Sequence, residues 1–509
     1  MAAGQERYYT DSVAGGREDY YLGKGEAPGH WLGGGARDLG IDGEVHAQSL
    51  SRILGGADPQ TGNPLGRLIG SGRVAGWDAT FSATKSISLL WALGAPGVSR
   101  AVRQAHDGAV QKALEYIEQE AAKSRRGLGG TTLVGTTGFV AAAFRHRTSR
   151  ALDPQLHSHV LIANIAHGVD GRWGALDGRL LYAHARTAGF LYEAELRHRL
   201  TEALGVEFGQ VRNGIAELAR VPSPVLREFS RRRQAIEARL SERGHTSARA
   251  ARVATLDTRE RKPEEVNWSE LTGEWQERAR KSGFGEPEIQ ELLHRQHPKA
   301  LSRQRANQIL GHLTSPSGLT KQASSFSRRH VLRGIAEQFQ QGSQIALIEA
   351  LADGLLASNL VIPLGQHGQA ADVDPQDMIA VKCTYDPATP GQGSRELERW
   401  STPEMLATEA ALLLNAESRQ GEGVAVISMG VLEAKLADRP ALANQPEQRA
   451  LVARLATSGA GVEVVRGKAG TGKPTSSQRS EKPGRNPGMR SWASPWPEGP
   501  RSASKRKQA

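Results

Sequence analysis

The sequence predicts an α+β fold, because strand-like and helix-like segments alternate up to about residue 207. Residues 76–82 alternate apolar and polar side chains, as a half-buried strand does. Residues 101–122 repeat apolar side chains at helical spacing. Two further strand-like segments, 135–144 and 157–165, flank a loop of about ten residues and form a candidate antiparallel hairpin.

The segment around residue 80 joins a predicted strand to a predicted helix. Alternation places one set of side chains on one strand face and the next set on the other: Trp77, Ala79 and Phe81, then Asp78, Thr80 and Ser82. This alternation makes Trp77 a core residue. A helix is expected over Lys85–Leu93, and Ser82 or Thr84 can cap its first turn.

The size of the chain predicts more than one domain. At 509 residues it is too long for one compact core, so about two or three domains are expected. No segment reaches the roughly 18 apolar residues of a membrane helix, and the N-terminus lacks the apolar region of a signal peptide. The single cysteine, Cys383, cannot form an intrachain disulfide. We therefore expect a cytoplasmic protein without membrane insertion.

The net charge of +11 suggests nucleic acid or another anionic surface as a partner, although many soluble proteins are mildly basic without binding either. Basic side chains gather in the helical segment 222–284. They can follow a DNA backbone, or they can be a solvated helix face. The set is Arg231, Arg232, Arg233, Arg249, Arg252, Arg259, Arg261 and Lys262.

Three histidines of the predicted hairpin form a candidate metal site. His157 and His159 share a strand face because they are two residues apart. His146 ends the preceding strand, and the hairpin brings it opposite that pair. Three imidazoles can hold a divalent cation and leave coordination positions open to substrate, where the ion would polarise a phosphate. The alternative is a solvated strand face. Asp78 can orient one ligand by accepting its second N–H, or it can be a solvated residue.

The tyrosines are concentrated at the N-terminus. The chain has 8, and four of them form the pairs Tyr8-Tyr9 and Tyr20-Tyr21. A phenolic oxygen can attack a phosphodiester and form a phosphotyrosine, provided that a nearby cation or base activates it. A three-histidine metal site would supply that cation. Paired tyrosines can also be packing residues.

These motifs together resemble a known family. The segments His146-Arg-Thr-Ser-Arg150 and Asp153-Pro-Gln-Leu-His-Ser-His159 resemble the metal motif of the TrwC/TraI-type conjugative relaxases, the MobF class with an HUH-type fold. The segment Asp78-Ala-Thr-Phe-Ser-Ala-Thr-Lys85 resembles their second motif, and the two tyrosine pairs resemble the first. The motifs occur in the family's order, and the resemblance extends to about residue 285.

The resemblance implies a relaxase domain over residues 1–285, with an antiparallel-sheet palm covered by helices and with helical fingers at about 222–285. Residues 286–330 would be a linker region. Residues 331–473 would be the partial N-terminal region of a RecD-like helicase, and residues 474–509 a disordered basic tail.

The resemblance also implies the chemistry. Tyr8 would cleave one DNA strand at a plasmid origin of transfer and stay attached to its 5′ phosphate, and Tyr20 would assist the later strand transfer. Tyr9 and Tyr21 are the alternates within the pairs. Asp78 would help to activate the tyrosine or orient a ligand, and the ligands to Mg, Mn or Zn would be His146, His157 and His159. The implied partners are single-stranded plasmid DNA and a type IV secretion coupling protein.

One departure concerns the N-terminus. Family members usually carry a short apolar strand before the first tyrosines, whereas this chain has only Met1 to Arg7 there. Either the start codon lies upstream or this copy is damaged, and we favour an incorrect start.

A glycine-rich segment in the second half fits a phosphate-binding P-loop, through Gly467, Gly470, Gly472 and Lys473. The hydroxyl residue that should follow to hold Mg²⁺ is replaced by Pro474. Later helicase motifs do not follow. We expect that helicase ATPase activity is lost and that ATP is not a working cofactor.

The segment after residue 473 has two interpretations. A shift of reading frame near codon 474 would explain why the helicase resemblance stops there. With GC-rich codons, a frame read two bases later would encode an apolar run in place of Trp492-Ala-Ser-Pro-Trp-Pro-Glu-Gly499. The alternative is an authentic basic tail that binds DNA by charge. Sequencing the downstream DNA distinguishes the two.

The leading functional hypothesis is a metal-dependent enzyme for DNA nicking and strand transfer. The second is a catalytically impaired DNA-binding remnant of a relaxase-helicase. A third class, an ATP-dependent motor, is opposed by Pro474 and by the missing motifs.

Overall fold

The protein is described here by a computed structural model, which covers residues 28–66, 74–127, 130–242, 267–297, 300–364, 398–424, 426–437 and 446–465. The chain divides into two compact units, Met1–Pro403 and Glu404–Ala509. Among the described residues, no helix combines the length and the apolar character needed to cross a membrane.

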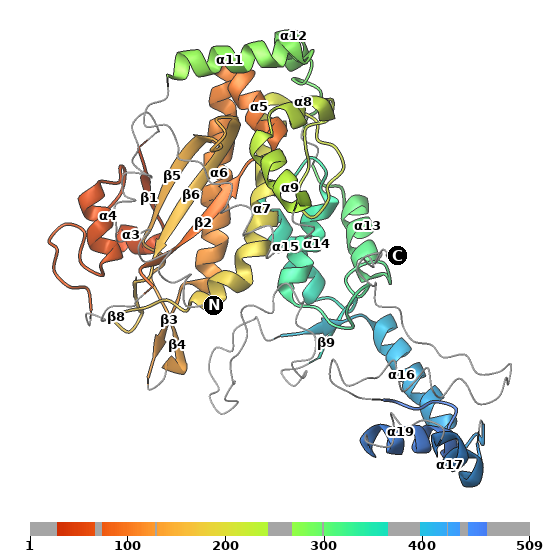
Figure 1. The fold of residues 1–509 in the computed structure, drawn as a ribbon. Helices are drawn as coiled ribbons and strands as arrows, with labels where there is room; N and C mark the ends of the chain where they lie inside the picture. Colours follow the sequence, from red (N-terminus) through yellow and green to blue (C-terminus); the bar gives the residue numbers. More distant parts are fainter. Residues whose placement is uncertain are drawn as a thin grey trace, which may run out of the picture. The chain divides into compact units, whose positions relative to one another are not determined.

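A four-stranded antiparallel sheet lies at the centre of the first unit (Figure 1). Its strands, in spatial order, are β1 (His30–Leu32), β5 (Ala141–Thr148), β6 (Pro154–Ala163) and β2 (Gly76–Ser82). The predicted α+β class and the predicted antiparallel hairpin are therefore confirmed, with β5 and β6 as its two strands.

The hairpin strands differ from the predicted ones in their bounds. The sequence predicts strands over 135–144 and 157–165, but β5 continues to Thr148 and β6 begins at Pro154. Backbone pairing carries β5 through the polar run that follows Phe144, with a register irregularity between His146 and Thr148. A polar run gives no apolar signal, so the pattern of side chains ends before the strand does.

Two long helices, α6 (Pro96–Ala121) and α7 (Gly178–Leu204), pack with one face of the sheet. Phe139, Ala141 and Val160 are fully buried in this larger core. The other face forms a smaller core with α3 (Gly34–Asp38) and α4 (Ala47–Leu54). Ala142 and Phe144 of β5, and Val140 just before this strand, are fully buried in it. The sheet is thus covered on both faces, which holds its central strands rigidly.

The predicted strand over residues 76–82 and the predicted helix over Lys85–Leu93 (α5) are confirmed with their bounds, and Thr84 is the N-cap residue of α5. The helix predicted from residue 101 begins earlier, at Pro96, because proline is favoured in a first helical turn. Trp77 is only half-buried and packs against the larger core.

Smaller elements complete the first unit. Two short hairpins pair β3 (Lys123–Arg126) with β4 (Thr132–Gly135), and β7 (Ala166–His167) with β8 (Trp173–Gly174). The following helices are α8 (Ser223–Glu228), α9 (Arg231–Glu242), α11 (Trp268–Lys281), α12 (Glu286–Gln290), α13 (Arg303–Thr314), α14 (Arg328–Gln338) and α15 (Ile345–Leu356). A last strand pair joins β9 (Ile362–Pro363) to β10 (Trp400–Ser401).

The helices after residue 300 pack into the same core as the sheet, which differs from the linker and separate domain expected there. Val331, Leu332 and Ile335 of α14 are fully buried in the larger core. The guanidinium of Arg328 donates to Glu120 of α6 at 2.9 Å and to Asp353 of α15 at 2.7 Å. The apolar side chains of α14 and α15 therefore pack into the core of the first unit. The expected linker, residues 286–330, contains helices α12 and α13.

The second unit is small and helical where it is described. Its helices are α16 (Pro403–Ser418), α17 (Met429–Ala437) and α19 (Pro446–Thr457), and Leu432, Leu436 and Val452 form a small buried cluster. The predicted P-loop residues Gly467, Gly470, Gly472 and Lys473 and the predicted tail 474–509 lie outside the described residues.

Candidate metal centre

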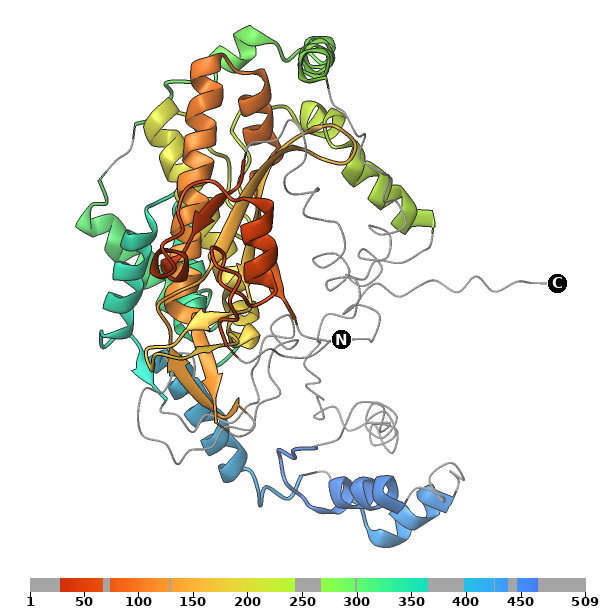
Figure 2. The same ribbon diagram turned by 90° about the vertical axis from the view of Figure 1, so that its left-hand side faces the viewer.

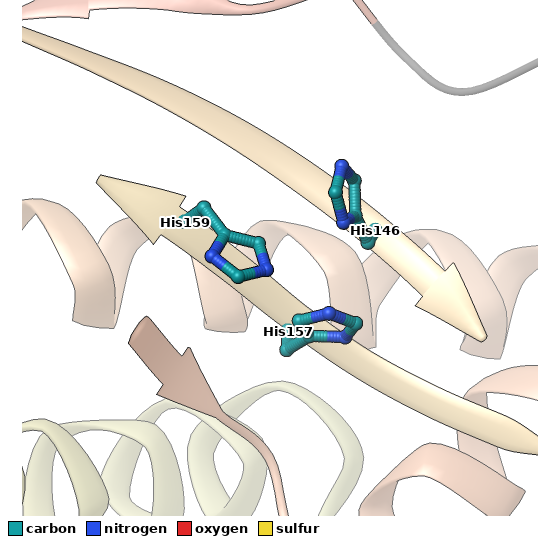
Figure 3. A group of neighbouring side chains, drawn as sticks. All are labelled: His146, His157 and His159. Carbon is teal, nitrogen blue, oxygen red and sulfur yellow. The ribbon is translucent and has the colours of Figure 1, made fainter. Parts of the chain in front are cut away.

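The three histidines of the predicted site lie together on the hairpin of β5 and β6 (Figure 3). The register pairs His146 directly with His157, and His159 follows two residues along the same face of β6. The ring centroids are separated by 5.3, 5.0 and 5.2 Å. One nitrogen of each ring lies within 4.8 Å of those of the other two. This is the convergence that the sequence predicts, and one ion can bridge the three rings.

The site lies on the sheet face that turns away from α6 and α7. His146 has the same strand parity as Ala142 and Phe144, which belong to the smaller core. His146 is buried, whereas His157 and His159 are half-buried. The cluster therefore lies on packed strands, and solvent or a ligand can reach it where His157 and His159 are partly exposed.

Partners of the β6 histidines set which ring nitrogen is available to a metal. The Nδ1 of His157 lies 2.9 Å from the carbonyl oxygen of Gln155, which can only accept a hydrogen bond. The Nδ1 of His159 lies 2.8 Å from a carboxylate oxygen of Asp78. Each Nδ1 therefore carries the proton, and each Nε2 offers its lone pair as a ligand.

Asp78 occupies the supporting position that the sequence suggests for it. It lies on β2, where the register sets Thr80 opposite His159. Both carboxylate oxygens of Asp78 lie within 3.0 Å of the His159 Nδ1, and the Thr80 hydroxyl lies 3.2 Å from the same nitrogen. A carboxylate in this position orients the ring and raises its basicity toward a metal. Thr80 was not singled out from the sequence, although it shares the strand face of Asp78.

The three donors fit a divalent metal ion. They are imidazole nitrogens, which suit zinc, copper, iron and nickel. Three protein ligands also leave positions for substrate or water, as in metal sites that perform chemistry. The divalent metal cofactor predicted from the sequence is thus supported by the donor set.

The opposite face of β6 holds a buried polar chain that sequence reasoning missed. The Ser158 hydroxyl lies 2.8 Å from Nε2 of His106 on α6, and Nδ1 of His106 lies 2.9 Å from the Tyr192 hydroxyl on α7. Burial, with smaller contributions from Arg145 and His157, lowers the pKa of His106 to about 3, so the ring is neutral. The chain ties β6 to both long helices between its two metal-site histidines. A lone helical histidine gives no sequence signal for such a contact.

Several predicted site residues fall outside the described parts of the chain. These are Tyr8, Tyr9, Tyr20, Tyr21, Arg249, Arg252, Arg259, Arg261 and Lys262. The cations of the basic segment that are described, Arg231, Arg232 and Arg233, begin α9.

The three arginines of α9 are not equivalent. Arg231 bonds to Asp153 through Nε at 2.9 Å, and its terminal nitrogen donates to the carbonyl of Ala151. Its guanidinium is therefore engaged within the protein, but the side chain is still 45% exposed, so the DNA contact expected of it stays a prediction. Arg233 is exposed over 75% of its side chain and pairs with Glu237 one turn along. Arg232 is half-buried.

The model of the TrwC relaxase family matches residues 2–282, which is more than half of the chain. Two proteins from Escherichia coli named multifunctional conjugation protein TraI, one from strain K12, are 36% and 35% identical over 289 residues. The match covers 54% of this chain and only 15% of each TraI protein.

Solved structures of the conjugative relaxase TrwC in complex with oriT DNA are also similar, among them a metal-free and a copper-bound form. They are 31% and 30% identical, with a TM-score of 0.48 in both cases. The similarity covers 54% of this chain and 96% of theirs.

Proposed function

Because the chain belongs to the TrwC relaxase family, we propose that it nicks one DNA strand at a plasmid origin of transfer and transfers that strand through a covalent phosphotyrosine. The observation that carries the proposal is the meeting of His146, His157 and His159, with Asp78 behind one of them. All four residues lie within the segment that the family model matches.

The histidine cluster would hold a divalent ion, with Mg, Mn and Zn as the candidates. When bound there, such an ion polarises a phosphate and stabilises negative charge on the reacting oxygens. The protein's own part is to fix the rings. Strand pairing places His146 against His157, and Asp78 holds the proton on Nδ1 of His159. Preorganised ligands of this kind require no rearrangement when substrate arrives.

We propose Tyr8 as the leading nucleophile and Tyr20 as the second, with Tyr9 and Tyr21 as the alternates. The phenolic oxygen of Tyr8 attacks the phosphorus, and a bond forms to the 5′ phosphate as the bond to the 3′ oxygen breaks. The phenolic proton leaves to base or solvent, and the released strand ends in a 3′-hydroxyl. Attack by a 3′-hydroxyl on the phosphotyrosine reverses the step and joins strands.

The proposed substrate is single-stranded plasmid DNA. The net charge of +11 favours a polyanionic partner. The basic helix α9 stands on the side of the sheet that faces away from α6, which is also the side of the histidines (Figure 2). Arg233, which is exposed on this helix, is the proposed phosphate contact. A type IV secretion coupling protein as partner and a cytoplasmic location are parts of the same proposal.

The glycine-rich segment is proposed to lack ATPase activity. Pro474 stands where the P-loop needs a hydroxyl to hold Mg²⁺, and a proline has no oxygen in its side chain. A phosphate-release assay with single-stranded DNA should give no signal above that of buffer. Turnover of ATP would contradict this part.

The test of the main proposal is covalent capture. Single-stranded oligonucleotides that tile the plasmid's origin of transfer, labelled at the 3′ end, are incubated with the protein and Mn²⁺ or Mg²⁺ and run on denaturing gels. A labelled protein band that Tyr8→Phe abolishes supports the proposal. Tight DNA binding without a band from any oligonucleotide would instead support a catalytically impaired DNA-binding remnant.

A further inference from the structure

The turn that joins the two metal-site strands is held by the basic helical region. Trp275 of α11 donates its indole N–H to the carbonyl of Leu152 at 2.9 Å. The guanidinium of Arg147, at the end of β5, lies 3.5 Å from the ring centroid of Trp268, the first residue of α11. Leu152 itself has a positive φ of 55°, so the turn adopts a conformation that needs support from its surroundings.

Asp153 is the centre of this contact. It is 1% exposed, and it lies in the metal motif four residues before His157. One carboxylate oxygen accepts the backbone N–H of Arg231 at 2.8 Å, at the first residue of α9. The other accepts Nε of Arg231 at 2.9 Å and two nitrogens of Arg278 on α11 at 3.1 and 3.2 Å. A buried carboxylate with two guanidinium partners and a helix N-terminus is strongly held in place.

The helix that Asp153 anchors does not pack its side chains into the core. No side chain of α9 in the described part of the chain is buried. Figure 2 shows this helix projecting away from the sheet. Its first residue, by contrast, is bonded to the buried carboxylate of Asp153 through both its backbone and its side chain.

The histidines are fixed by other means. His157 and His159 lie on a strand that is paired on both edges, with β5 and with β2. The carboxylate of Asp78 holds one of them, and the buried chain through Ser158 holds the strand between them. Loss of Asp153 should therefore leave the metal ligands in place.

We propose that Asp153 is a positioning residue that aims α9 at the DNA strand bound over the histidine cluster. This proposal rests on the proposed function, because it takes DNA as the ligand of this face. It gives a role to the part of the metal motif that binds no metal. Asp153 acts on substrate binding through α9 and leaves the metal site unchanged.

The test uses the full chain with Asp153→Asn, which keeps the shape and removes the charge. We expect affinity for single-stranded DNA, measured by fluorescence anisotropy, to fall about tenfold, the size of a typical coupling between two sites. The slope of log affinity against log salt should become shallower, since phosphate contacts of α9 are lost. Metal affinity from calorimetric titration should not change. In the adduct assay, KM for DNA should rise while kcat at saturating DNA is unchanged.

Matched variants separate this proposal from simpler effects. Asp170 lies in the β7–β8 turn and pairs with Arg126 of β3. The variant Asp170→Asn removes this carboxylate and should bind DNA as the wild type does. Asp153→Glu should restore most of the DNA affinity. Where circular dichroism shows that Asp153→Asn is unfolded, Arg278→Gln replaces it, because Arg278 holds Asp153 from α11 and lies outside α9.

Two results would overturn the proposal: unchanged DNA affinity in a folded Asp153→Asn or Arg278→Gln protein, or a loss of metal affinity equal to the loss of DNA affinity. A wild-type protein that binds DNA but forms no adduct would refute only the nicking function, because the binding and metal measurements still test the role of Asp153.

Discussion

Strand β6 and helix α9 both carry residues of the proposed site, but the protein holds them in opposite ways. Seven of the ten residues in β6 are buried, alternating at first and then in a continuous run at the end of the strand, whereas α9 has no buried residue where it is described. The position of the histidines is therefore set along the whole strand, by pairing and by packing. Helix α9 is held at its first residue by the buried carboxylate of Asp153. Metal binding should tolerate changes in α9, and DNA binding should not tolerate loss of its anchor.

The largest effect is expected from removing a ligand. His157→Ala should lower metal affinity by at least about 100-fold and abolish the covalent adduct, since outer partners of metal ligands alone are worth about 10–100-fold. Calorimetric titration with Mn²⁺ and the gel assay measure the two effects. The matched control is His167→Ala, because His167 pairs with Asp38 and stacks on Trp173 away from the cluster. An adduct of normal yield from His157→Ala would contradict the metal site.

The next effect concerns the residue behind His159. Asp78→Ala should lower metal affinity by about 10–100-fold, because the ring loses the carboxylate that orients it. Asp78→Asn should lose less, since its amide oxygen can still accept the N–H. DNA affinity measured without metal should stay near that of the wild type. Equal metal affinities for the wild type and Asp78→Ala would show that the strand alone fixes the ring.

A pH effect should come from the packed region and not from α9. Burial raises the pKa of Glu193 to about 8, since Arg197, 3.7 Å away, offsets only part of the desolvation. The unfolded-state value is near 4.5, so the stabilising contribution of the protonated group is complete below that pH and is lost as pH rises through about 8.

The variant Glu193→Gln mimics the protonated form at every pH. Its free energy of unfolding should not decrease through ionisation at this position as the pH rises. The variant should therefore be more stable than the wild type at pH 8 and about as stable as the wild type at pH 4.5. Urea unfolding at both values measures the difference. A wild-type stability that does not fall relative to the variant between these values would show that Glu193 is ionised in the folded protein.

The smallest effect is expected at the exposed surface of α9. Arg233→Ala should weaken DNA binding only a few-fold and reduce the salt slope by about 1, as one phosphate contact does. The control is Arg280→Ala, an arginine of α11 that is exposed over 66% of its side chain and pairs with Glu277. Equal losses in the two variants would mean that charge in general, and not the position of α9, sets the affinity.

Local patterns allowed part of this structure to be predicted. The alternation over residues 76–82 and the cap at Thr84 are signals within a few residues, and the elements they predict have the expected bounds. The histidine cluster followed from strand parity and one turn, because His146 and His157 are paired neighbours in a hairpin.

Contacts between distant segments could not be predicted in the same way. Asp153 and Arg231 are 78 residues apart, and Asp153 and Arg278 are 125 apart, so nothing in the local pattern links them. The motif from Asp153 to His159 therefore predicted metal ligands, but it did not predict the contacts of Asp153 with α9 and α11. The apolar periods of α14 and α15 were visible, but periodicity does not tell which core a helix joins, and these helices join the core of the first unit.

The two-sided use of β6 restricts how this hairpin can change in length. Its histidines point to one face and the Ser158 hydroxyl to the other, so one inserted residue would send an imidazole into the buried side and a hydroxyl into the ligand set. The turn is also held at two residues, because Leu152 is hydrogen-bonded to α11 and Asp153 to α9. Insertions and deletions between residues 146 and 159 should therefore be selected against. Single substitutions at half-buried positions such as Gln155 should be tolerated more often.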